Sequence, residues 1–287
     1  MPTKSGAEIY LFPTHPGSHV QNLLNPEAEA ASPSTQQPTY AIAHRVLRPG
    51  AVTAALSHSV NALEVDLTPW DTEWWADHDG TDNSAVSDDH LFFWLDIKDP
   101  DYCKEPERGC SVETLRESLL PAGVRALYGF FETEKSRGLA VMKETLRANE
   151  AICLSREASE VLNLYGDPDS GITVEQRIMD YGYSQLDQGF SDCHEADSYT
   201  CAELRIRQGN CDKGLLGKVF GWTSTQGDTK LVDMLLESAT VDGIIYGFQD
   251  ADCTDDIVPK AAIQGLVDFV TNHPDSRRIA TIDDAPW

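Results

Sequence analysis

The chain has 287 residues, of which 41% are hydrophobic, so it can form one large domain with a sizeable core. Its formal net charge of −25, without any basic stripe, argues against nucleic-acid binding, because such a surface must neutralise phosphates. The same charge repels anionic membranes and leaves zwitterionic membranes and cationic groups as compatible partners.

Residues 1–38 are predicted to be a partly disordered N-terminal extension of a domain at residues 39–287. The stretch from Asn25 to Pro38 is rich in proline, serine and glutamine, which favour turns and disorder. No signal peptide is visible, and no apolar run approaches the ~18 residues that a membrane span requires. We therefore expect no transmembrane segment, and we expect a monomer.

Short apolar runs alternate with amphipathic segments from Tyr40 onward. The runs cover residues 40–46, 62–68, 91–98, 126–132, 151–155, 177–183, 218–224 and 243–248. Helical periodicity is seen at residues 112–120, 137–148, 157–164, 229–238 and 257–271. This alternation predicts an α/β fold with a parallel sheet, and eight strands close a single (β/α)8 TIM barrel. The polar, cysteine-rich segment 184–217 is expected to be irregular.

Seven cysteines are present without any paired CxxC spacing, which makes a structural zinc site improbable. Most lie in polar stretches, where disulfides form in an oxidising compartment. Cys103 and Cys110 flank a short polar loop and are expected to be bonded to each other. Cys153 lies in an apolar run and is expected to be a free, buried thiol. Cysteine usage thus favours a secreted protein.

Carboxylates interrupt the second and third apolar runs near their ends. Glu64 and Asp66 are two residues apart, so on a strand both side chains point to the same face. A buried pair of carboxylates is costly unless a positive group neutralises it. With Asp96 of the third run, the pair offers the oxygen ligands that Mg²⁺ prefers, at the strand ends where TIM barrels carry their active sites.

Two histidines and a lysine accompany these carboxylates. His44 ends the first run and His78 follows the second, so the pair can supply one base and one acid to a phosphodiester. Lys98, two residues after Asp96, is placed to neutralise a phosphate. Taken singly, each feature has a plainer interpretation. A histidine at a strand end is often structural, and a pair of carboxylates on a strand is common on a solvent-exposed face. His78 fits a solvated loop, and Lys98 fits a charged strand end. Their occurrence together in the first three units favours a catalytic site.

The pattern resembles the glycerophosphodiester phosphodiesterase-like superfamily. The residues that carry this resemblance are His44, Glu64-x-Asp66 and His78. Two further motifs are similar to those of the sphingomyelinase D and phospholipase D toxins of spiders, corynebacteria and fungi. They are the strand Lys218-Val-Phe-Gly-Trp222-Thr223 and the terminal Ala280-Thr-Ile-Asp-Asp-Ala-Pro-Trp287. This resemblance extends from Tyr40 to Trp287 and implies a TIM barrel whose C-terminal segment plugs its bottom.

The resemblance also implies a role for each site residue. Mg²⁺ would be held by Glu64, Asp66 and Asp96, with His44 and His78 as acid and base, Lys98 on the phosphate and Trp222 in the headgroup pocket. The implied reaction releases choline from sphingomyelin or lysophosphatidylcholine by transphosphatidylation to a cyclic phosphate. Departures at Thr225 and Gly247 leave the lipid preference open. The alternatives are a phosphodiesterase of soluble glycerophosphodiesters and a non-catalytic lipid-binding barrel.

Overall fold

The computed structural model describes most of the chain from residue 36 onward. The described residues are 36–71, 73–78, 92–119, 124–133, 135–166, 171–195, 199–248, 250–281 and 283–287. The predicted extension at residues 1–38 lies almost wholly outside them.

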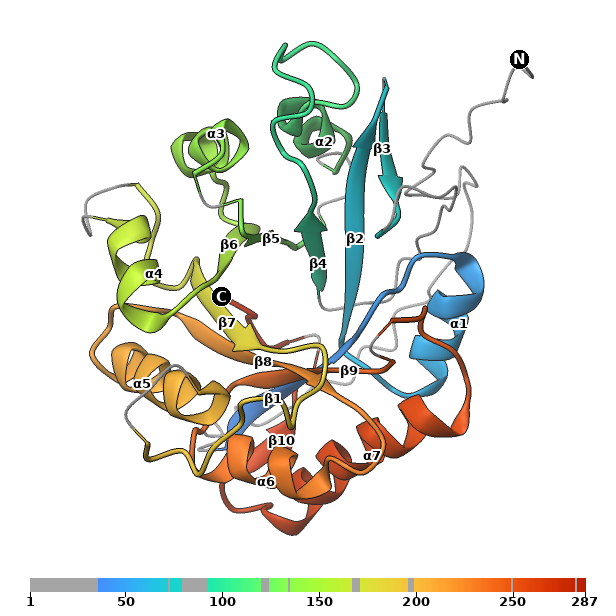
Figure 1. Ribbon diagram of the computed structural model, residues 1–287, viewed down its shortest axis with the longest axis vertical. Coiled ribbons are helices and arrows are strands. Elements are labelled where there is room, and N and C mark those ends of the chain that lie inside the picture. Colours follow the sequence, from blue (N-terminus) through green and yellow to red (C-terminus); the bar gives the residue numbers. More distant parts are fainter. Residues whose placement is uncertain are drawn as a thin grey trace, which may run out of the picture.

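Eight parallel strands form the centre of the molecule (Figure 1). They are β1 (Gln37–Ala43), β2 (Ala62–Trp70), β4 (Phe92–Ile97), β5 (Ala126–Phe131), β6 (Glu150–Ser155), β7 (Arg177–Gly182), β8 (Lys218–Ser224) and β9 (Gly243–Tyr246). Each pairs with its neighbours in chain order, and the pairing of β1 with both β9 and β2 closes the ring. The predicted TIM barrel is confirmed, and all eight apolar runs form its strands.

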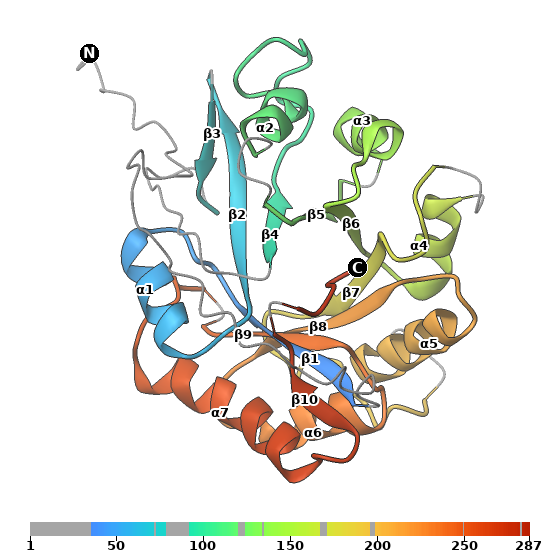
Figure 2. The same cartoon turned by 180° about the vertical axis from the view of Figure 1, so that it is seen from behind.

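Helices surround the barrel on the outside (Figure 2). They are α1 (Pro49–Ser57), α2 (Val112–Leu119), α3 (Arg137–Thr145), α4 (Ala158–Tyr165), α5 (Thr200–Asp212), α6 (Thr229–Glu237) and α7 (Ile257–Asn272). The expectation that residues 184–217 are irregular is wrong at α5. This helix buries the side chains of Leu204 and Arg207 completely, while Arg205 and Ile206 are exposed, so its sequence shows little apolar periodicity. None of the helices in the described ranges is long and apolar enough to cross a membrane.

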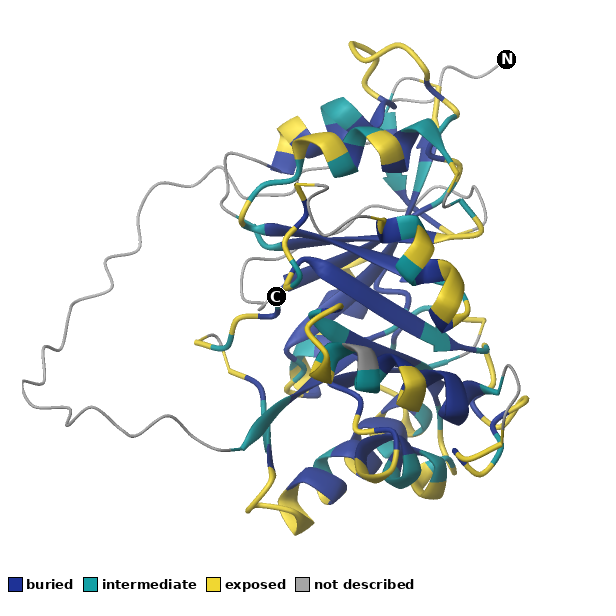
Figure 3. Cartoon of the chain, turned by 90° about the vertical axis from the view of Figure 1, so that its left-hand side faces the viewer, coloured by how far each residue is buried: buried dark blue, intermediate teal, exposed yellow. Residues whose placement is uncertain are grey.

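Two short strands extend the sheet beyond the barrel. β3 (Glu73–Ala76) runs antiparallel to β2 and pairs with its last residues, so a hairpin projects past the carboxyl ends of the barrel strands. β10 (Arg277–Ile279) runs parallel to β1 at the opposite end. Figure 3 shows the buried strands enclosed between elements with exposed outer faces.

The C-terminal segment covers the amino ends of the strands. The Trp287 ring lies edge-on to Phe92, with the ring centroids 5.6 Å apart. The Tyr40 hydroxyl donates to the Ala285 carbonyl at 2.9 Å, and the Asn61 amide donates to the Ala280 carbonyl at 3.2 Å. The predicted plug at the bottom of the barrel is therefore confirmed.

Aromatic rings fill the barrel between this plug and its upper half. Phe220 contacts Phe92 and, one layer higher, Trp94, whose ring centroid lies 5.5 Å from that of Phe220. The Trp94 indole lies directly over Gly129, where a Cβ atom would come within 2.5 Å of the indole nitrogen. Glycine at position 129 thus lets Trp94 form the floor of the space above.

Two disulfides lie in connections that follow the carboxyl ends of strands. The Cys103–Cys110 bond after β4 confirms the predicted pair, and Cys193–Cys201 forms a second after β7. Cys153 is free and buried, as predicted. The remaining cysteines, Cys211 and Cys253, are also free. These two disulfides indicate folding in an oxidising compartment.

Candidate active site

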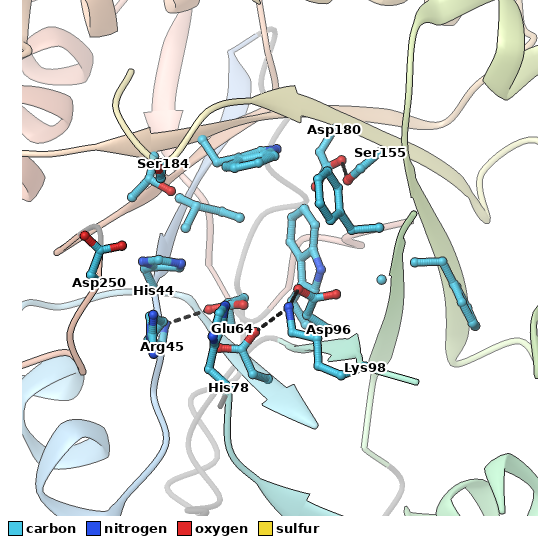
Figure 4. A pocket seen from close by; sticks show the side chains of 18 residues that line it. His44, Arg45, Glu64, His78, Asp96, Lys98, Ser155, Asp180, Ser184 and Asp250 are labelled. Carbon is cyan, nitrogen blue, oxygen red and sulfur yellow. Dashed lines mark hydrogen bonds and ion pairs between the residues drawn. The ribbon is translucent and has the colours of Figure 1, made fainter. Parts of the chain in front are cut away.

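A cavity of ≈ 250 Å³ opens at the carboxyl ends of the strands (Figure 4). The residues for which the sequence predicts a role all line it: His44, Glu64, Asp66, His78, Asp96, Lys98 and Trp222. They come from β2, β4 and β8 and from the segments after β1, β3 and β4. Barrel closure therefore gathers side chains that are up to 178 positions apart in the chain (Trp222 and His44). Their individual roles remain predictions.

Three carboxylates stand together on adjacent strands. Asp66 of β2 is in register with Asp96 of β4, and Glu64 lies one inward position below Asp66. One oxygen from each lies within 4.8 Å of the others. Burial raises the pKa of Glu64 well above its usual value, and the charges of Asp66 and Asp96 raise it further. Concentrated negative charge of this kind needs a cation.

Hydrogen bonds orient the carboxylates. The Arg45 backbone N–H donates to Glu64 Oε2 at 2.6 Å. Lys98 Nζ lies 2.9 Å from Asp66 Oδ1 and 2.5 Å from Asp96 Oδ2. Although burial lowers the pKa of Lys98, these two carboxylates outweigh it and raise the pKa above its usual value. The ammonium group therefore stays charged.

The donor set fits a hard divalent cation. Asp66 Oδ2 is buried, and no hydrogen-bond partner for it exists among the residues that the structure describes. A buried carboxylate oxygen is costly to leave unpaired, because it has lost its contact with water. Carboxylate oxygens are the ligands that Mg²⁺ prefers. The geometry thus leaves a ligand atom available beside Glu64 and Asp96.

His44 is held in one orientation immediately after β1. Its backbone N–H donates to the Tyr246 carbonyl at 3.0 Å, and its ring Nδ1 lies 2.6 Å from the Phe248 carbonyl oxygen. A carbonyl can only accept, so Nδ1 carries the proton and Nε2 keeps its lone pair. Burial lowers the pKa of His44 to about 4, so the ring is neutral at pH 7.

The β2–β3 hairpin brings His78 to the cavity. The Asp77 backbone N–H donates to the Asp66 carbonyl at 2.9 Å, and the Thr68 hydroxyl donates to the Asp77 carbonyl at 2.6 Å. These bonds hold the segment before His78 against β2. His78 itself is exposed at the cavity rim, in contrast to the more enclosed His44.

The opposite wall of the cavity is aromatic and acidic. Trp222 packs perpendicular to Phe131, with the ring centroids 5.9 Å apart. Beside them Asp180 of β7 accepts a hydrogen bond from the Ser155 hydroxyl of β6. The sequence analysis missed Asp180 and Ser155. Asp180 interrupts the apolar run at residues 177–183 and lines the cavity, but no second carboxylate two residues away marks it as Glu64 marks Asp66.

Known protein families and proteins with similar sequences point to one family. The family model described as Sphingomyelinase D/Phospholipase D matches residues 34–287. A sphingomyelinase D of Aspergillus flavus is 51% identical over 274 residues, covering 88% of this chain and 92% of that protein. A sphingomyelinase D of Uncinocarpus reesii is 40% identical over 275 residues, covering 88% and 78%.

Among solved structures, a glycerophosphodiester phosphodiesterase from Agrobacterium tumefaciens aligns with a TM-score of 0.44 and 14% identity, covering 79% of this chain and 99% of that one. The family model spans most of the chain. Both relatives are at least 40% identical to this chain over most of their own lengths. The chain therefore belongs to the sphingomyelinase D/phospholipase D family and is a phosphodiesterase of the phospholipase D type.

Proposed function

We propose that this protein is a Mg²⁺-dependent phospholipase D that releases choline from sphingomyelin or lysophosphatidylcholine. The observation that carries the proposal is one cavity with a carboxylate cluster and two histidines on one side and an aromatic, acidic wall on the other. The relatives named sphingomyelinase D support sphingomyelin as a substrate. The two disulfides support secretion.

Glu64, Asp66 and Asp96 would hold the Mg²⁺ ion. When bound, Mg²⁺ draws negative charge from the phosphate oxygens as that charge grows in the transition state. Lys98, fixed to Asp66 and Asp96, adds a second positive charge at the same edge of the cavity. The phosphodiester is thus held between this edge and the opposite wall.

His44 is assigned as the base and His78 as the acid. The neutral His44 ring presents Nε2, which takes the proton from the hydroxyl group of the lipid itself. That oxygen bonds to phosphorus, the bond from phosphorus to the choline oxygen breaks, and His78 donates a proton to the leaving oxygen. The products are a cyclic phosphate and choline. Because the nucleophile is tethered to the substrate, little entropy is lost in bringing it to the phosphorus.

The opposite wall suits a cationic headgroup. Faces of Trp222 and Phe131 attract a quaternary ammonium, because aromatic rings carry negative charge on their faces. The buried carboxylate of Asp180 adds a counter-charge on the same wall. This wall supports a choline headgroup, and the substrate comparison below separates a choline lipid from glycerophosphocholine, a substrate of the competing phosphodiesterase of soluble glycerophosphodiesters.

A phosphorus NMR time course tests the proposal. Sphingomyelin and lysophosphatidylcholine in mixed micelles with Mg²⁺ are expected to give a new cyclic-phosphate resonance, and glycerophosphocholine is expected to react far more slowly. The Asp96→Asn variant, matched in size, is the inactive control. Preferred turnover of glycerophosphocholine would establish the competing function, and no turnover of any diester would favour a non-catalytic lipid-binding barrel.

A further inference from the structure

Large aromatic side chains are exposed on one arc of the barrel mouth. In the described part of the chain they are Trp70, Tyr102 and Phe131, with 53%, 54% and 45% of their surfaces exposed. Trp70 ends β2, Tyr102 follows β4, and Phe131 ends β5, so the three follow the carboxyl ends of neighbouring strands. We call these residues the aromatic arc. The exposed large aliphatic side chains belong to the α5 and α7 segments and are Ile206, Leu215 and Ile257.

Contacts of the Asp71 carbonyl connect the parts of the aromatic arc that follow β2 and β4. The turn after Trp70 presents the Asp71 carbonyl, which accepts a hydrogen bond from the Arg108 guanidinium at 2.8 Å. The sulfur of Cys110 lies 3.0 Å from the same oxygen, and its disulfide partner Cys103 directly follows Tyr102. The hairpin and the disulfide loop thus form one unit. A preformed surface loses less conformational entropy on binding than a loose one.

One member of the aromatic arc reaches the catalytic cavity. Phe131 lines the cavity and packs against Trp222. On β2, Trp70 is four residues after Asp66, so by the period of two it lies on the same face of the strand. A headgroup that enters beside the arc therefore meets the carboxylate cluster along one strand face.

The aromatic residues of the arc and the net negative charge of the chain favour a zwitterionic bilayer as the partner of this surface. Tryptophan and tyrosine concentrate at membrane–water interfaces, because each combines an apolar ring with a polar group. The net charge of −25 disfavours anionic lipids, so apolar contacts rather than basic residues must supply the attraction. We infer that the aromatic arc docks the enzyme on zwitterionic, choline-headgroup bilayers and directs the cavity toward the lipid surface. This inference rests on the proposed function, because it assumes a lipid substrate in a membrane.

The test uses the full chain with Mg²⁺ and the double variant Trp70→Ala/Tyr102→Ala, which leaves the cavity residues intact. Sedimentation with sucrose-loaded phosphatidylcholine–sphingomyelin vesicles is expected to give partitioning at least about tenfold weaker than for the original chain. Choline release from monomeric lysophosphatidylcholine, below its micelle concentration, is expected to stay unchanged. The matched control is Ile206→Ala/Leu215→Ala, which removes exposed apolar groups outside the arc.

Each outcome has a defined meaning. Undiminished vesicle binding by the arc variant, or an equal loss in the control variant, overturns the docking surface. A parallel loss of monomer turnover also overturns it, since the arc would then belong to the substrate site. If the original chain binds vesicles through the arc but releases no choline, the docking inference stands and the proposed function fails.

Discussion

Replacing Glu64 by glutamine should stabilise the metal-free protein while abolishing its Mg²⁺ binding. The side chain is 4% exposed and keeps its hydrogen bond, since a glutamine oxygen can still accept from the Arg45 backbone N–H. The substitution removes one of three clustered negative charges without changing the shape of the site. Lys98 contacts Asp66 and Asp96 and keeps both partners.

The magnitude follows from the spacing of the carboxylates. For oxygens 4.8 Å apart, at an effective dielectric constant of ~20, repulsion is about 3 kcal/mol for each pair. Glu64 belongs to two such pairs, about 6 kcal/mol together, and the charge of Lys98 and the hydrogen bond from Arg45 offset most of this, so we expect a net gain of about 2 kcal/mol for Glu64→Gln. For large single domains that gain corresponds to a melting temperature roughly 4–8 °C higher. In saturating Mg²⁺ the original chain becomes the more stable of the two. Mg²⁺ at 100 times its Kd adds about 2.7 kcal/mol to the free energy of unfolding of the original chain, and nothing to that of the variant, which does not bind it.

The stability gain of Glu64→Gln should also depend on pH, in a definite direction. Folding raises the pKa of Glu64, so its destabilising effect is present at high pH and disappears as the group is protonated. Thermal unfolding in EDTA should therefore show the largest advantage of Glu64→Gln near pH 8 and a smaller one on acidification. Glu117→Gln, on the exposed face of α2, is the control and should change little. An EDTA melting temperature equal to or below that of the original chain at pH 8 would refute the reasoning, as would retained Mg²⁺ affinity.

Three further predictions concern the site and the plug. His44→Asn and His78→Asn should each slow choline release by ~100-fold or more with unchanged Mg²⁺ affinity; normal turnover in His78→Asn would remove it from the mechanism. Mg²⁺ binding near pH 6 should release protons, because burial raises the pKa of both Glu64 and Asp96 in the metal-free protein; calorimetric heats that are equal in buffers of different ionisation enthalpy would contradict this. Trp287→Ala should lower the free energy of unfolding by about 3 kcal/mol, since it empties the space beside Phe92, and an unchanged denaturation midpoint would show that the plug carries no stability.

The barrel could be predicted from the sequence because its strands are buried on both faces. Such strands appear as continuous apolar runs, and polar residues inside them are conspicuous. Glu64, Asp66 and Asp96 were found in this way, and the structure brings their oxygens together. Because TIM barrels carry their active sites at the carboxyl ends of the strands, the same rule predicts that the three carboxylates lie together.

The acidic wall was harder to predict because it depends on pairing between strands. Ser155 and Asp180 are opposite each other in the β6–β7 register, which a single sequence does not reveal. Helix α5 was hidden for a different reason. Its buried face includes Arg207, a charged residue that sequence patterns assign to the surface, although here it donates to the Asp180 carbonyl and lies over the Tyr181 ring.

The two ends of the barrel divide stability from chemistry. At the amino end, the partly buried Trp287 plug packs against the cluster of buried aromatic rings above it. At the carboxyl end, the carboxylate cluster concentrates like charges that oppose folding until a cation binds. Both disulfides also follow carboxyl ends of strands, one after β4 and one after β7. Covalent bonds thus reinforce the end of the molecule that carries the carboxylate cluster, where functional groups stand in place of the aromatic packing of the amino end.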